Sequence, residues 1–237
     1  MDVGGAWRML ARLFLPRYCM VCFKAINSDF ICTNCVEMMA LVDLNAFCIH
    51  CSAPLPNAYS GACKDCEGKA VLFDRIVFAC RYESCARLLL HRFKYGFDRL
   101  CGKVVSARLL AQIQALGFKD YQKAVLLPVP LHHWRLWRRG FNQSQYVAQF
   151  LSRKLAIPVQ LHLVKRVKHT KPQHRLKVKD RKRNLSCAFE VLKKIEAEHI
   201  ILIDDVFTSG ATLREMAKVI KQHNSDIRVD AWVFAKA

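Results

Sequence analysis

The chain has 237 residues, of which 53% are hydrophobic, and its formal net charge is +19 at pH 7. This hydrophobic content is enough for a folded core and excludes a chain that is disordered throughout. The length allows one domain of ordinary size together with a small one, and the positive charge is large for this size.

Residues 6–15 predict a short amphipathic helix that carries Arg8 and Arg12 and is too short and too charged to span a bilayer. The chain contains 12 cysteines, a number that could indicate a secreted disulfide protein. However, no signal-peptide pattern precedes them, and most of them occur in Cys-x-x-Cys pairs. We therefore expect a cytoplasmic protein with reduced thiols and no membrane span.

The first 70 residues contain four such pairs, which are Cys19/Cys22, Cys32/Cys35, Cys48/Cys51 and Cys63/Cys66. A two-residue spacing lets both thiolates bind one tetrahedral zinc ion, so the eight thiolates predict two closed, structural zinc sites. Sequential pairing and interleaved pairing of the four motifs have the same sequence signature. His50, beside Cys51, is expected to be a bystander. Because large apolar residues are few, zinc should fold a ribbon domain over residues 1–70, followed by a second domain over residues 71–237.

Beyond residue 70, apolar runs with strand character alternate with amphipathic helical segments. We expect strands over residues 73–82, 124–130, 159–164, 200–203 and 228–235. We expect helices over residues 86–93, 99–116, 143–156 and 213–222. This alternation indicates the α/β class, with a parallel sheet flanked by helices.

Two basic segments interrupt the alternation, a loop over residues 132–142 and a long polar stretch over residues 169–189. Between His132 and Arg183 there are 15 Lys or Arg residues and one acid, Asp180, which suits a nucleic-acid backbone. Aromatic residues interleaved with arginines are the pairing that single-strand binders use for stacking. The candidate nucleic-acid contacts are Trp134, Arg135, Trp137, Lys171, Arg175, Arg181 and Arg183. Alternatively, the tryptophans pack in the core and the charge serves a phosphate ligand alone.

The strand over residues 200–203 ends in Asp204 and Asp205, followed by Thr208-Ser209-Gly210-Ala211-Thr212 and a helix. A small-residue loop before a helix presents backbone N–H groups and the positive end of the helix dipole to an anion. The two carboxylates cannot serve a phosphate, but they suit ribose hydroxyls or a metal next to it. The simpler alternative is a strand followed by a well-capped helix.

The sequence IDDVFTSGAT resembles the phosphoribosyl-diphosphate (PRPP) loop of type I phosphoribosyltransferases. The resemblance implies that Asp204 and Asp205 hold the ribose 2′- and 3′-hydroxyls, and that Mg²⁺ chelates the diphosphate. It implies a 5′-phosphate cradle formed by Thr208, Ser209, Gly210, Ala211 and Thr212. It also implies a diphosphate-binding loop with Arg138, Arg139 and Gly140, and a flexible hood over residues 169–189 that closes over the site.

Four Cys-x-x-Cys pairs, then HRFKYG, PVPLHHWRLWRRGFNQS, RKRNLSCAF and IDDVFTSGAT, resemble in this order the ComF family of competence proteins. That family combines a double zinc ribbon with a phosphoribosyltransferase domain and serves DNA uptake in natural transformation. The resemblance implies that Lys94 reaches the diphosphate. It predicts binding of PRPP and single-stranded DNA, with helicase or recombination proteins as partners. The alternatives are a salvage phosphoribosyltransferase with an unknown acceptor, and a zinc-ribbon adaptor.

Overall fold

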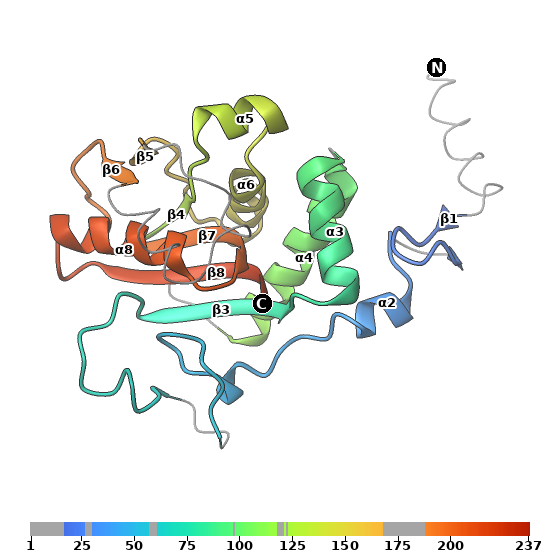
Figure 1. Cartoon of the computed structure of the whole chain (residues 1–237), viewed down its shortest axis with the longest axis horizontal. Helices are drawn as coiled ribbons and strands as arrows, with labels where there is room; N and C mark the ends of the chain where they lie inside the picture. Colours follow the sequence, from blue (N-terminus) through green and yellow to red (C-terminus); the bar gives the residue numbers. More distant parts are fainter. Residues whose placement is uncertain are drawn as a thin grey trace.

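The computed structural model describes residues 17–26, 30–56, 61–96, 98–117, 121, 123–167 and 188–237. Within these residues a four-stranded parallel sheet forms the centre of the molecule (Figure 1). Its strands are β3 (Arg75–Arg81), β8 (Arg228–Lys236), β7 (His199–Phe207) and β4 (Ala124–Pro128), in this spatial order. The parallel pairing confirms the predicted α/β class.

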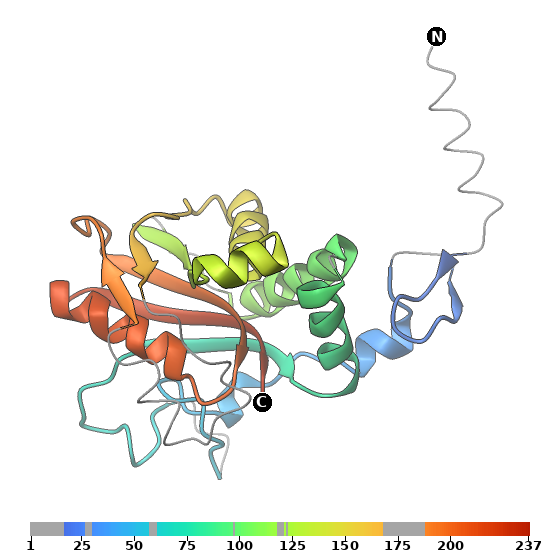
Figure 2. The same ribbon diagram turned by 45° about the horizontal axis from the view of Figure 1, so that its top comes forward.

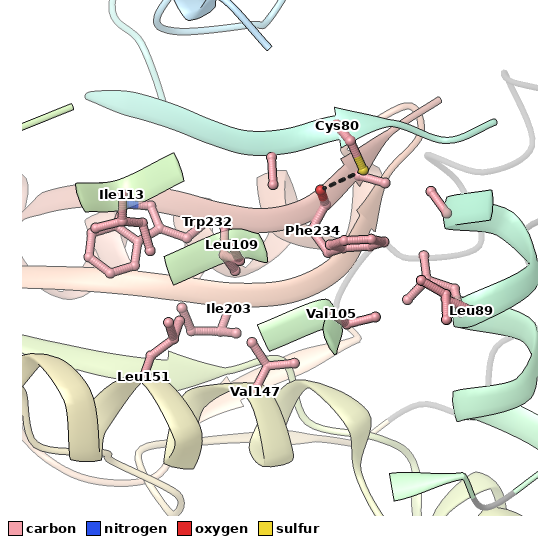
Figure 3. Close-up of a cluster of buried hydrophobic side chains, with 14 of the residues drawn as sticks. Cys80, Leu89, Val105, Leu109, Ile113, Val147, Leu151, Ile203, Trp232 and Phe234 are labelled. Atoms are coloured by element: carbon pink, nitrogen blue, oxygen red, sulfur yellow. Dashed lines mark hydrogen bonds between the residues drawn. The ribbon is translucent and has the colours of Figure 1, made fainter. Parts of the chain in front are cut away.

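Both faces of the sheet are covered, which explains why its strands are apolar without alternation. The helices α4 (Arg99–Ala115) and α6 (Gln143–Leu155) pack on one face, where Ile201 and Ile203 of β7 point. Figure 3 shows side chains from both helices around Ile203 and Trp232. The opposite face buries Ile200 and Leu202 against α8 (Ala211–His223). Asp204 and Asp205 are therefore carried by a strand that is buried on both faces.

Four segments differ from the prediction near the carboxyl edge of the sheet. The basic loop over residues 132–142 contains a short helix, α5 (His133–Arg139), because His132 caps its start and Gly140 its end. β7 does not end at Ile203, because its pairing with β8 continues to Phe207. Helix α8 begins at Ala211, and α3 (Ser84–Tyr95) extends through Lys94.

The strand predicted over residues 159–164 is wrong in position. Only Val159 bridges to β4, through Leu126, and the next three residues leave the sheet with exposed side chains. The strand begins instead at β5 (Val164–Arg166), which pairs antiparallel with β6 (Phe189–Val191) outside the central sheet. This two-stranded ribbon flanks the segment predicted as the hood, of which residues 169–187 lie outside the described residues.

The cysteine-rich segment lies beside α3 and then runs beneath β3 in both ribbon views (Figures 1 and 2). It carries β1 (Arg17–Tyr18), β2 (Ala25–Ile26), α2 (Thr33–Glu37) and the 3-10 helix η1 (Leu44–Ala46). Val42 N donates to Ala79 O at 3.2 Å, and Ile76 N donates to Ile49 O at 2.8 Å, so this segment covers the edge strand β3.

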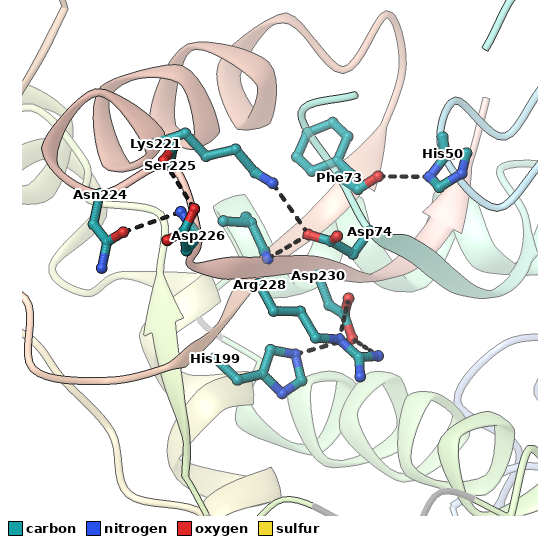
Figure 4. A network of polar contacts seen from close by, with 11 residues as sticks. His50, Phe73, Asp74, His199, Lys221, Asn224, Ser225, Asp226, Arg228 and Asp230 are labelled. Carbon is teal, nitrogen blue, oxygen red and sulfur yellow. Dashed lines mark hydrogen bonds and ion pairs between the residues drawn. The ribbon is translucent and has the colours of Figure 1, made fainter. Parts of the chain in front are cut away.

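A polar network ties the amino ends of the strands together (Figure 4). Asp74 Oδ2 accepts from Val229 N at 2.8 Å and lies 3.3 Å from Lys221 Nζ. Asp230 Oδ2 lies 3.0 Å from both His199 Nε2 and Arg228 Nη2. These groups lie at the opposite edge of the sheet from Asp204 and Asp205. Among the described helices, none has both the length and the apolar character needed to cross a membrane.

Candidate active site and zinc centres

The two acidic residues of β7 have different partners at the carboxyl edge of the sheet. Asp205 pairs with Lys94 at the end of α3, with Lys94 Nζ 2.8 Å from Asp205 Oδ1 and 2.8 Å from Oδ2. Asp204 Oδ1 accepts from Ser144 Oγ at 3.0 Å and from the backbone N–H of Asp205 at 2.9 Å. The structure thus brings the predicted Lys94 and both predicted acids together, although 111 residues separate Lys94 from Asp205.

The electrostatics of the pair follow from this arrangement. Burial raises the pKa of Asp204 to about 7, and the neighbouring Asp205 raises it as well. Lys94 and the hydrogen bond from Ser144 oppose this rise. Burial would lower the pKa of Lys94, but Asp205 outweighs this effect and the pKa of Lys94 is raised. Lys94 is therefore held as a cation, while Asp204 is poised to change charge near neutral pH.

The loop that follows β7 leads directly into helix α8. Gly210 precedes this helix with a φ of +67°, and no side chain of the described residues caps the helix start. Ser209 Oγ is buried and has no hydrogen-bond partner among the residues that the structure describes. A buried hydroxyl that has no partner among the described residues and lies at a helix N-terminus fits an anionic ligand such as a phosphate. Thr208 is exposed, and Ala211 and Thr212 form the first turn of α8.

The short helix α5 carries the predicted arginines on different faces, because successive residues are about 100° apart. Arg139 faces the site and donates to Gln143 Oε1 at 3.1 Å and to Tyr95 Oη at 3.2 Å. Burial lowers the pKa of Arg135, and the nearby Arg139 lowers it further, so these two residues lie close together. Arg138 is exposed on another face, and Gly140 ends the helix.

The sequence did not single out Arg166, Gln143 or Ser144 as parts of this site. Arg166 is only 6% exposed and stacks over the Phe189 ring at 5.5 Å. Burial lowers the pKa of Arg166 to about 10. Arg135 lowers it further, whereas Asp204 opposes this shift. No motif marks Arg166. Gln143 and Ser144 directly follow Asn142, whose side chain caps α6, so recognising that cap would have placed them at this edge.

Trp134 and Trp137 lie on the outer face of α5. They are 53% and 77% exposed, and their rings stack with centroids 5.3 Å apart and 24° between the planes. The alternative in which both indoles pack in the core is therefore wrong. Phe141 instead points inward and contacts Phe93, with ring centroids 5.4 Å apart. Apart from Arg135 on α5, the remaining predicted nucleic-acid contacts lie outside the described residues; they are Lys171, Arg175, Arg181 and Arg183.

The eight paired cysteines form two groups of four, in which all the Sγ atoms of a group lie within 4.8 Å of one another. The grouping is sequential, with Cys19, Cys22, Cys32 and Cys35 in one group and Cys48, Cys51, Cys63 and Cys66 in the other. Four thiolates at this separation fit one tetrahedral zinc ion, so the chain has two sites suited to structural zinc.

Backbone N–H groups assist both cysteine groups. Cys19 Sγ accepts from Val21 N and from Cys32 N, each at 3.4 Å. Burial would raise the pKa of Cys19, but backbone N–H donors outweigh it and lower the pKa to about 6. Such donors stabilise the thiolate that zinc requires. His50 is not part of either group, since its Nδ1 lies 2.8 Å from Phe73 O (Figure 4).

Comparison with known protein families gives one match near the start of the chain and one over its last part. Residues 10–67 match a double zinc ribbon domain, and residues 142–236 match a phosphoribosyl transferase domain. The chain is 32% identical to competence protein F of Haemophilus influenzae over 222 residues, covering 90% of this chain and 93% of that protein. It is 30% identical over 239 residues to DNA utilization protein YhgH of Escherichia coli K12, covering 98% and 97%. It is 27% identical over 192 residues to competence protein ComFC of Bacillus subtilis, covering 77% and 75%.

Proposed function

Because the chain belongs to the ComF family of competence proteins, we propose that it serves the uptake and use of external DNA, binding PRPP and single-stranded DNA. The relatives are named for competence and for DNA utilization. The observation that carries the PRPP proposal is the convergence of Lys94, the two acids of β7 and the loop before α8 at one edge of the sheet.

In this proposal each part of PRPP meets a different group of residues. The 5′-phosphate lies at the start of α8, where Ser209 Oγ and the backbone N–H groups after Gly210 donate hydrogen bonds to it. Asp204 and Asp205 accept hydrogen bonds from the ribose hydroxyls. The diphosphate lies toward Arg139, with Arg135 and Arg166 adding positive charge around it.

This arrangement suits a transfer of the phosphoribosyl group. Such a reaction breaks the bond between the anomeric carbon and the diphosphate, which leaves as an anion, and forms a new bond from that carbon to a nucleophile of the acceptor. In the transition state positive charge develops on the ribose and negative charge on the leaving group. The arginines would stabilise the leaving diphosphate, and the acids would hold the ribose in position. Mg²⁺, when bound together with PRPP, would supply further neutralisation of the diphosphate.

A pair of variants on α5 tests PRPP binding. We expect Arg139→Ala to weaken PRPP binding at least tenfold, measured by calorimetry with Mg²⁺ present, because a charge-assisted contact to phosphate is lost. Arg138→Ala removes the same charge from the neighbouring residue on the exposed face, and we expect it to leave PRPP affinity unchanged. Equal effects of the two variants, or a wild type that does not bind PRPP, would contradict the proposal.

The stacked pair Trp134 and Trp137 carries the DNA proposal, since exposed indoles beside arginines can stack on unpaired bases. We expect an oligo-dT to bind with an affinity that falls steeply as salt rises. Replacing both tryptophans with alanine should weaken this binding about tenfold or more, given about 1–3 kcal/mol per stacked base, and spare PRPP binding. Fluorescence anisotropy of a labelled oligonucleotide measures both effects, and binding insensitive to salt would overturn the proposal.

A further inference from the structure

A groove of about 580 Å³ lies between the start of α4, the end of α5 and the outer side of α6. Among the described residues that the sequence predicts to bind PRPP or nucleic acid, Gly140 alone lines this groove. The groove is bordered by Leu136 and Gly140 of α5, and its polar lining comes from Arg99, Asn142, Gln145, Tyr146, Gln149 and Arg153. It is separate from the PRPP site, because Lys94, Arg139, Asp204 and Asp205 do not line it.

The groove is positively charged. No Asp or Glu lines it, and neither Arg99 nor Arg153 has an ion-pair partner among the described residues. Tyr146 Oη donates to the main-chain O of Arg99 at 3.1 Å and so joins the start of α4 to α6. Arg99 and Arg153 are both exposed, so each of the two helices contributes one guanidinium side chain to the groove lining.

The polar lining from α6 forms a regular stripe. Gln145, Gln149 and Arg153 are spaced by four residues, so their side chains follow one side of the helix over about 12 Å. Two amides and a guanidinium in a row can hydrogen-bond both base edges and phosphate oxygens. The Asn142 side chain is not available for this, because it caps α6 and donates to Val129 O at 3.0 Å.

Helix α5 lies between the groove and the PRPP site, and it also carries the tryptophan pair. One side of α5 turns Arg135 and Arg139 toward the PRPP site, and another turns Leu136 and Gly140 into the groove. Trp134 and Trp137 lie on the outer face of α5 between these sides and are not part of the groove lining. An extended strand whose bases stack on the indoles could therefore continue into the groove without passing the PRPP site.

We propose that this groove binds single-stranded DNA, with Arg99 and Arg153 contacting phosphates and Gln145 and Gln149 contacting bases. The inference rests on the proposed binding of single-stranded DNA and gives it a path across the outside of α4, α5 and α6. Along this path the DNA passes outside the PRPP site. An acidic peptide would match the two arginines but would leave the stacked indoles and the amide stripe without a role.

The test compares an Arg99→Ala/Arg153→Ala variant with a Lys193→Ala/Lys194→Ala control. The control removes the same charge from exposed residues that line a pocket at the amino edge of the sheet. Anisotropy titrations of full-length, zinc-loaded protein with oligo-dT are carried out at several salt concentrations. We expect the groove variant to bind more weakly and to lose about 1.4 from the slope of log K against log salt, since each phosphate contact contributes about 0.7. The control variant and PRPP binding should match the wild type in these assays.

A gain-of-function variant makes the test independent of loss of folding. Gln149→Lys adds a cation to the stripe, so it should tighten oligo-dT binding and steepen the salt slope. If the wild type binds no oligonucleotide, the DNA part of the proposed function fails. If the Trp134→Ala/Trp137→Ala variant loses oligo-dT binding while the groove variants match the control, the tryptophan pair still binds DNA and the path through the groove is overturned. Binding of oligoglutamate that needs both arginines, with oligo-dT binding unchanged, would also overturn it.

Discussion

Asp204 and Asp205 are neighbours in sequence, yet the fold gives them opposite electrostatic environments. Asp205 has a cation 2.8 Å away, so its charge is compensated. Asp204 has a hydroxyl and a backbone N–H as donors, and burial together with Asp205 raises its pKa to about 7. The sequence shows two acids side by side and cannot reveal this difference, because Lys94 and Ser144 come from distant segments.

Replacing Asp204 with asparagine should stabilise the protein at pH 8. A carboxyl whose pKa is raised on folding favours the folded state below its unfolded pKa near 4, and this advantage is lost as the pH rises through about 7. Asn keeps an oxygen for Ser144 and avoids the buried charge. The melting temperature of Asp204→Asn should therefore exceed that of wild type at pH 8, and the difference should shrink toward pH 5. About 1 kcal/mol corresponds to about 2–4 °C in a chain of this size.

The matched control is Asp205→Asn, for which the opposite sign is expected. This change leaves Lys94 with a largely buried charge and no carboxylate on Asp205 to pair with it. Removing one partner of such a pair costs about 3 kcal/mol, so the melting temperature should fall at pH 8. If the two asparagine variants melted alike across the pH range, the assigned difference between the acids would be wrong.

Gly210 should tolerate no side chain, for two separate physical reasons. Its φ of +67° is strained for other residues, and an added Cβ would lie 2.3 Å from Cζ of Phe207. Gly68 has the same φ of +67° but nothing within 4 Å of an added Cβ. Gly68→Ala should therefore cost about 1–2 kcal/mol from backbone strain, and Gly210→Ala about 1–3 kcal/mol more from crowding. Urea unfolding measures both, and equal losses would argue against the tight contact with Phe207.

At the level of elements, the apolar strands and the amphipathic helices could be predicted, and the basic segment after β4 could not. Strands buried on both faces show continuous apolar runs, as β7 does. Helix α5 spans seven residues and buries none of its side chains, so it has no apolar stripe to detect. Its caps and the packing of its neighbours decide its conformation. The conformation of this helix determines which arginines face the PRPP site and which face solvent.

For the zinc sites, too, the sequence predicts the ligands but not how they are grouped. The Cys-x-x-Cys spacing predicts two four-cysteine sites, but the choice between sequential and interleaved pairing depends on how the chain folds back. The structure groups neighbouring motifs, with each Sγ set within 4.8 Å. The sequence therefore predicts the ligands and the number of sites, whereas the pairing depends on how the chain folds.

Double cysteine variants test this pairing by counting zinc. In the sequential arrangement Cys22 and Cys32 serve one ion, so Cys22→Ser/Cys32→Ser should retain about one zinc per chain. Cys22 and Cys51 serve different ions, so Cys22→Ser/Cys51→Ser should retain almost none. Elemental analysis of the purified proteins gives both counts. If pairs 19/22 and 48/51 shared an ion, the two outcomes would be exchanged.

At the scale of the whole molecule, the cysteine-rich segment and the sheet share one packed structure. The first cysteine group lies in the same apolar cluster as α3 and α4, and Phe47 packs edge-on against Phe78 of β3 at 5.0 Å. Arg92 of α3 donates to Met20 O, and Gln112 of α4 donates to Val42 O at 2.8 Å. The cysteine-rich segment therefore shares packing surfaces with the sheet and its helices.

Removing zinc should therefore lower the melting temperature of the entire chain. Structural zinc contributes about 10–16 kcal/mol in small zinc peptides, which is comparable to the whole stability of a typical domain, about 5–15 kcal/mol. Because backbone hydrogen bonds join the cysteine-rich segment to β3 at Val42 and Ile49, its unfolding would expose the edge of the sheet. Calorimetry should show one cooperative transition that shifts down with a strong chelator and is unaffected by chelator already saturated with zinc. Two transitions, the upper one insensitive to the chelator, would instead mean that the sheet folds independently of the zinc ribbon.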